Sequence, residues 1–110
     1  MTIKELTDKL QLTLLTTEAD TSKEISGGFC SDMLSYVMGK SDEGQAWITI
    51  QGHNNIIAVA ALKELACIIL ADGVKADVET IESAHKQGVA VLSSTDKTFL
   101  LAGKLYELLK

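Results

Sequence analysis

Three short polar segments contain the residues that are best suited to bind a ligand. Each segment follows an apolar run, and the three are Gly52-His53-Asn54-Asn55, Asp72-Gly73, and the group Thr95, Asp96 and Thr98. The free N–H groups and the dipole at the start of a helix attract anions. The histidine and asparagine side chains add further hydrogen-bonding groups. The pattern therefore indicates a site for a small ligand or for a partner chain.

Each segment also has a purely structural explanation. Gly52 suits a tight turn, and Asn54 or Asn55 is a good cap for the following helix. Asp72 is typical of a solvated turn, and the hydroxyl residues near position 95 are common capping residues. Both explanations stay open here. The functional one depends on the expectation that the three segments meet at one edge of a sheet.

Residues suited to catalysis are few. The sequence contains no G-x-S-x-G, no Walker loop, no H-E-x-x-H and no paired-cysteine metal spacing. Cys30 and His53 would have to meet in space to form a nucleophilic pair. Cys30 and Cys67 each lie in an apolar run, which is typical of small buried side chains. We therefore expect no enzyme, no metal site and no cofactor.

Alternating strand and helix patterns must position these segments. Three β-rich runs and three helical patterns follow one another, in the order 47–50, 56–65, 67–70, 77–87, 89–92 and 96–109. Connections of this length make neighbouring strands parallel, and ligands gather outside the carboxyl ends of parallel strands. The runs are apolar without alternation, which indicates strands covered on both faces.

The N-terminal half of the chain is less regular. Thr2 and Glu5 form a capping box that begins a first helix. Three further elements follow: a short strand at 12–16, a glycine-interrupted strand at 25–30 and a helix at 32–38. We predict an α/β fold in one domain, residues 1–110, with a mostly parallel sheet of four or five strands flanked by helices.

Two helices are unusually apolar. Residues 56–62 are apolar around the whole helical circumference, which indicates burial on nearly every side. Because one small chain offers little cover for such a helix, we predict a homodimer with an interface at Ile56, Ile57, Val59 and Ala60. The alternative is that the first helix and the region of Phe29 cover it. In the last helix one flank contains Phe99, Ala102, Gly103 and Tyr106, and Gly103 suggests close packing, since a mid-helix glycine costs about 1 kcal/mol against alanine.

Composition excludes several classes of protein. The chain has 110 residues, of which 46% are apolar, and its 15 acidic and 10 basic residues give a formal charge of −5. That charge, without a basic stripe, argues against nucleic acid as a partner. No basic stretch precedes an apolar one, and the apolar runs are far shorter than the roughly 20 residues of a membrane span. We expect a cytoplasmic protein with no membrane contact.

Four stretches have a recognisable order: GGFCSDML at 27–34, WITIQ at 47–51, HNNI at 53–56 and AGKLYEL at 102–108. In these stretches the chain resembles the stand-alone DRTGG domain, a module related to the N-terminal domain of HPr kinase/phosphorylase and the middle domain of long phosphotransacetylases. The motif that names the family is degenerate here. Its Gly-Asp-Arg turn reads Gly52-His53-Asn54, and its Thr-Gly-Gly reads Ala71-Asp72-Gly73.

The resemblance implies a non-catalytic regulatory or protein-interaction module that acts as a homodimer. The catalytic domain of HPr kinase is missing. Stand-alone copies accompany hydrogenase components in some anaerobic bacteria, so the resemblance also implies another protein as partner, in redox or hydrogenase-related regulation. The alternative function is a small-molecule sensor that binds an adenine nucleotide or another anion at Gly52, His53, Asn54, Asn55, Asp72 and Gly73.

Overall fold

A five-stranded sheet in the order β1-β5-β4-β3-β2 runs through the centre of the protein. The computed structural model describes all 110 residues. The four parallel strands are β2 (Gly27–Cys30), β3 (Gln45–Thr49), β4 (Cys67–Leu70) and β5 (Ala90–Ser93). The short strand β1 (Thr13–Leu14) pairs antiparallel with β5. The predicted α/β fold with a mostly parallel sheet is confirmed.

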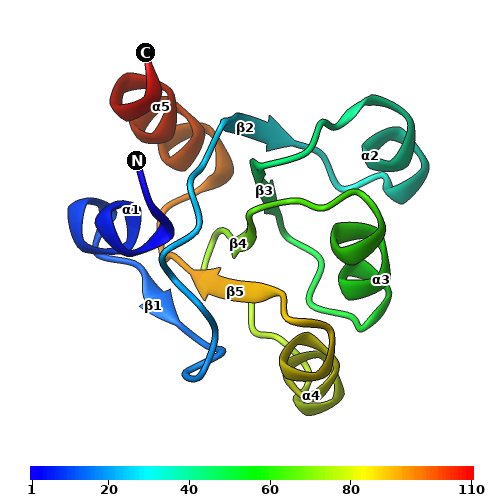
Figure 1. Cartoon of the computed structure of the whole chain (residues 1–110). Helices are drawn as coiled ribbons and strands as arrows, with labels where there is room; N and C mark the ends of the chain where they lie inside the picture. Colours follow the sequence, from blue (N-terminus) through cyan, green and yellow to red (C-terminus); the bar gives the residue numbers. More distant parts are fainter.

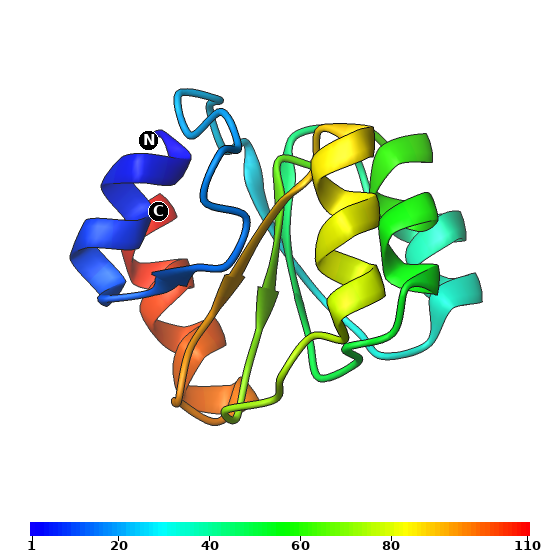
Figure 2. The same cartoon turned by 90° about the horizontal axis from the view of Figure 1, so that it is seen from below.

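Helices cover both faces of the sheet. Helices α1 (Ile3–Leu10) and α5 (Thr98–Leu109) lie on one face, and Figure 2 shows them on the left of the sheet. The opposite face carries α2 (Leu34–Lys40), α3 (Asn55–Leu62) and α4 (Val78–Gln87). None of these helices has the length and apolar character needed to cross a membrane.

Neighbouring residues on each buried strand pack into different cores. Ile48, Ile69 and Leu92 contribute to the core beneath α1 and α5. Their neighbours Trp47, Ile68 and Val91 contribute to the core beneath α3 and α4. Side chains on a strand point alternately to its two faces, and both faces are covered here. That is why the strands read as unbroken apolar runs.

The local signals for the first helix are confirmed. The Glu5 backbone N–H donates to Thr2 Oγ1 at 3.1 Å, and the Thr2 N–H donates to Glu5 Oε1 at 3.0 Å. These two bonds form the predicted capping box. They satisfy donors that the first turn of a helix otherwise leaves unpaired.

The structure corrects the assumption that α3 needs a second chain to cover it. The four side chains assigned to a dimer interface are each at most 9% exposed within the single chain: Ile56, Ile57, Val59 and Ala60. Helix α3 lies on the sheet between α2 and α4 and contacts both (Figure 1). The reason for placing an interface on these residues is therefore removed, whereas the homodimer itself stays a prediction.

The close packing of α5 is at a different glycine from the one expected. A Cβ atom at Gly103 would meet no atom within 4 Å. At Gly28, in contrast, a Cβ would lie 2.9 Å from Leu105 Cδ2. The close contact of α5 with a glycine is therefore at Gly28 on β2, against the Leu105 side chain, and a Cβ atom at position 103 has free space.

Candidate functional site

The loops after β3, β4 and β5 meet at the carboxyl edge of the sheet, as expected. The Asp72 N–H donates to the carbonyl oxygen of Asp96 at 2.7 Å, and the Gly73 N–H donates to that of Ser94 at 2.9 Å. These bonds join the loop after β4 to the loop after β5. The loop after β3 is joined to the same group through Gly52.

Gly52 is required by a close contact with the loop after β4. A Cβ atom at this position would overlap the carbonyl oxygen of Lys75. The Gly52 carbonyl oxygen accepts hydrogen bonds from the Asp77 N–H at 3.1 Å and from Thr80 Oγ1 at 2.8 Å. These contacts hold the loop after β3 against the start of α4, so this glycine has a complete structural explanation.

His53 is held by an acidic residue rather than pointing freely into solvent. Its Nδ1 lies 3.0 Å from Asp77 Oδ2, and the two side chains are 75% and 57% exposed. Asp77 occupies the predicted N-cap position of α4, but its side chain makes no capping hydrogen bond. The carboxylate faces the imidazole instead.

The three helices that follow β3, β4 and β5 begin without a side-chain cap, as does α2 after β2. Their N-cap residues are Asn54 for α3, Asp77 for α4 and Lys97 for α5, and none makes a side-chain capping hydrogen bond. The capping role considered for Asn54 is therefore absent, and Asn55 is the first residue of α3. Uncapped helix starts present N–H donors and a positive dipole end to an anion.

Acidic side chains at the same edge oppose that attraction. Asp72 has a φ of 58° and Gly73 a φ of 68°, so both lie in the left-handed region, which aspartate tolerates better than most residues. Lys97 Nζ lies 3.5 Å from Asp72 Oδ1, and Lys104 Nζ lies 2.8 Å from Asp96 Oδ2. The arrangement therefore combines backbone donors with carboxylates that lysines partly neutralise.

Asp32 connects the loops after β2 and β3, a role that the sequence interpretation did not identify. Its Oδ1 accepts from Thr49 Oγ1 at 2.8 Å and from the Ile50 N–H at 2.9 Å. Its carbonyl oxygen accepts from the Gln51 side-chain amide. Its position just after an apolar strand is the sequence feature that points to this role, but the pattern predicts a helix that begins at residue 32, whereas α2 begins at Leu34.

An apolar groove of about 620 Å³ lies outside the predicted ligand loops, between β2 and α5. Its lining includes Gly28 and Cys30 from β2 and Phe99, Gly103 and Tyr106 from α5. Phe99 is 92% exposed and Tyr106 is 68% exposed. The apolar flank of the last helix, noted in the sequence, forms one wall of this groove. Only the tertiary structure shows that no other part of the chain covers that flank. Of the predicted ligand residues, Gly73 lines a separate cavity of about 490 Å³.

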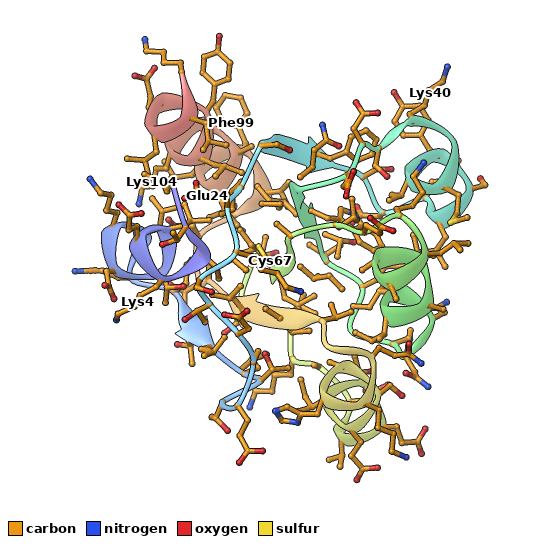
Figure 3. All side chains as sticks on the ribbon, viewed as in Figure 1. Lys4, Glu24, Lys40, Cys67, Phe99 and Lys104 are labelled. Carbon is orange, nitrogen blue, oxygen red and sulfur yellow. The ribbon has the colours of Figure 1, made fainter.

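The two cysteines lie in different environments. Cys67 is completely buried on β4, at the centre of the view in Figure 3, and burial raises its thiol pKa to about 12. Cys30 is exposed, which corrects the expectation that both are buried. Partial removal from water, followed by the Asp32 carboxylate, raises the pKa of Cys30. Cys30 faces α5 whereas His53 contacts Asp77 at the start of α4, so the structure does not bring them together.

Comparisons with known proteins agree with this architecture. A crystal structure of the CBS and DRTGG domains of the regulatory region of Clostridium perfringens pyrophosphatase, complexed with the activator diadenosine tetraphosphate, is similar with a TM-score of 0.67 and 18% identity. The match covers 94% of this chain and 44% of that chain, so the present chain spans less than half of its length. No curated protein matches significantly. The family model described as the DRTGG domain matches residues 28–108. The chain therefore belongs to the DRTGG domain family.

Proposed function

We propose that this chain is a non-catalytic regulatory module that acts as a homodimer. The family supports this proposal, and so does the likeness of the fold to part of a region described as regulatory in a pyrophosphatase. Both cysteine thiols have raised pKa values, so neither is an activated nucleophile at neutral pH.

The observation that carries the proposal is the exposed apolar surface of α5. Phe99 is 92% exposed, Tyr106 is 68% exposed and Leu100 is 50% exposed, all on this one helix. Contiguous apolar surface of this kind marks protein–protein interfaces. Burying one large apolar side chain that was exposed stabilises an assembly by about 1.5–3 kcal/mol. Two copies that cover these residues gain that stabilisation twice, once from each chain.

Light scattering after size-exclusion chromatography tests the homodimer directly. We expect one species of twice 11.8 kDa at micromolar concentration. Dilution should shift it toward the monomer, because association depends on protein concentration. A species of 11.8 kDa alone, at tens of micromolar, would contradict the proposal.

A second candidate function is a sensor for an adenine nucleotide or another anion. Three uncapped helix starts at one edge of the sheet favour it, and the similar pyrophosphatase region was crystallised with an adenine-containing activator. A nucleotide at 100 times its Kd should add about 2.7 kcal/mol to the free energy of unfolding. A thermal-shift panel of nucleotides measures this.

Two substitutions with opposite expected signs sharpen the sensor test. Asp72→Asn removes a carboxylate from the predicted site and should tighten anion binding. Lys97→Gln removes the cation that lies 3.5 Å from it and should weaken binding. Lys86→Gln, near the far end of α4, is the matched control for a lost lysine. The absence of a thermal shift with every nucleotide, in all of these variants, would exclude a nucleotide sensor.

A further inference from the structure

β2 is the longer of the two free edges of the sheet. Its four residues, Gly27–Cys30, pair with β3 on one side only, because β2 is the last strand in the order. The other edge strand, β1, has two residues. A free edge offers backbone N–H and C=O groups to another strand. β2 is therefore the position at which this sheet is best able to accept a further strand.

Exposed apolar side chains flank this edge on both faces of the sheet. Five of the eight large apolar side chains that are exposed lie on or directly before α2 and α5: Met33, Tyr36, Phe99, Leu100 and Tyr106. The Tyr36 ring stacks on the Phe29 ring of β2 with centroids 5.6 Å apart. Helix α5 lies beside β2 on the other face (Figure 1). Exposed apolar side chains therefore lie beside the β2 edge on both faces of the sheet, Tyr36 on one face and Phe99 and Tyr106 on the other.

The α5 part of this surface has a depression between two rings. Phe99, Gly103 and Tyr106 follow one another at helical spacing along the groove. A Cβ atom at Gly103 would meet no atom of its own chain within 4 Å. A glycine leaves room for a neighbouring helix or ring to approach. Because nothing in the chain fills that room, the space is available to another molecule.

The charge of the chain and of the groove lining indicates which molecule could occupy the groove. The chain carries 15 acidic residues and a formal charge of −5, so two copies have net charges of the same sign, which oppose association. None of the 12 residues that line the groove is acidic, and Lys110 is the only charged one. A two-fold axis places each surface against its own copy. The groove, which no acidic residue lines, is the part of this surface where two such chains meet with least repulsion.

We infer that two copies of this chain pair antiparallel through β2, with α5 of each copy packed against α5 of the other. This inference rests on the proposed homodimer and names its surface. An antiparallel pair of identical strands is symmetric about a two-fold axis, so each copy satisfies the edge of the other. An axis perpendicular to the sheet keeps both α5 helices on one face. The product is a continuous sheet of ten strands.

Substitutions at the groove test the inference. Gly103→Glu introduces an acid into the depression at a position where the added Cβ meets no atom of its own chain, so the fold should persist while the dimer dissociates. Phe99→Ser and Tyr106→Ser should each raise the dimer Kd at least tenfold. Leu62→Ser on α3 and Val78→Ser on α4 remove side chains that are 70% and 75% exposed, and should change the Kd less than twofold. Sedimentation equilibrium gives the Kd, and circular dichroism checks the fold.

Hydrogen exchange tests the strand pairing separately. In the wild-type dimer the amides of Gly28 and Cys30, which alternate with those that donate to β3, should exchange at least tenfold more slowly than in the Gly103→Glu monomer. Equal exchange rates in the two proteins would overturn the pairing of β2. A dimer that tolerates all three groove substitutions would overturn the surface but leave the proposed homodimer intact. A wild-type monomer would overturn both.

Discussion

Helices α3 and α5 are both apolar around most of their circumference, yet they end in opposite situations. In α3 the side chains of Ile56 and Ile57 are at most 1% exposed, because α2 and α4 lie on either side. In α5 the sheet covers Leu101 and Leu105, whereas Phe99 stays 92% exposed at the edge. A helix that is apolar on all sides must be buried, but its own composition does not say whether the same chain or another molecule buries it.

The largest expected effect is the difference in alkylation rate between Cys67 on the buried strand β4 and Cys30 on the edge strand β2. Cys67 reacts only when the core opens, so at an unfolding free energy of about 5 kcal/mol it should label on the order of 1000-fold more slowly than Cys30. Both rates should rise with pH, because the pKa of Cys30 is raised and because Cys67, once exposed by opening, has an ordinary thiol pKa of about 8.5, also above neutrality. Mass spectrometry after pulse alkylation of dilute protein measures the two rates. Comparable rates would show that β4 is not the closed interior described above.

Truncation of a buried α3 residue should produce the next largest effect. Ile56 is fully buried, so Ile56→Ala should lower the free energy of unfolding by about 2–5 kcal/mol. Phe99→Ala, in the Gly103→Glu monomer, should change it by less than about 0.5 kcal/mol, because an exposed side chain loses little. Urea denaturation followed by circular dichroism measures both. Equal losses at the two positions would refute the contrast between α3 and α5.

A smaller loss of stability is expected at Gly52. Gly52→Ala forces a Cβ into the Lys75 carbonyl oxygen, and overpacking of this kind costs about 1–3 kcal/mol. Gly73→Ala is the control, because its φ of 68° is strained for alanine but no atom lies within 4 Å, and left-handed strain alone costs about 1–2 kcal/mol. The double variant with Lys75→Ala should not relieve the Gly52 effect, since the contact is with the backbone. If the Lys75→Ala substitution restored the stability lost in Gly52→Ala, the clash would not be with the Lys75 backbone.

The smallest effect is a gain at Gly103. Gly103→Ala should raise the unfolding free energy of the monomer by about 0.5–1 kcal/mol, because alanine is the better helix former and meets no atom. In the dimer the same change should weaken association, since the added methyl occupies the depression. Thermal melts at several protein concentrations separate the two contributions. A loss of monomer stability would mean that α5 already packs closely at this position.

The elements of the regular C-terminal part could be predicted because their signals are local. Asp77 and Gly88 mark the two ends of α4 as N-cap position and left-handed C-cap, and the apolar run at 67–70 coincides with β4. The meeting of three loops at one sheet edge follows from parallel strand order alone. The roles of individual site residues were harder to predict. The partner of His53 is Asp77, 24 positions away, and no local pattern specifies that contact.

Hydropathy period and capping residues are properties of neighbouring positions, so the sequence by itself determined the α/β order, the parallel strands and the carboxyl-edge loops. The burial of a helix depends on segments that are distant in the sequence and adjacent in the fold. Only the tertiary structure decided that α2 and α4 enclose α3, that Gly52 is needed because of Lys75, and that α5 remains open beside β2. The physical reason is that burial depends on the sum of all neighbours in space, whereas a sequence pattern reports only the neighbours along the chain.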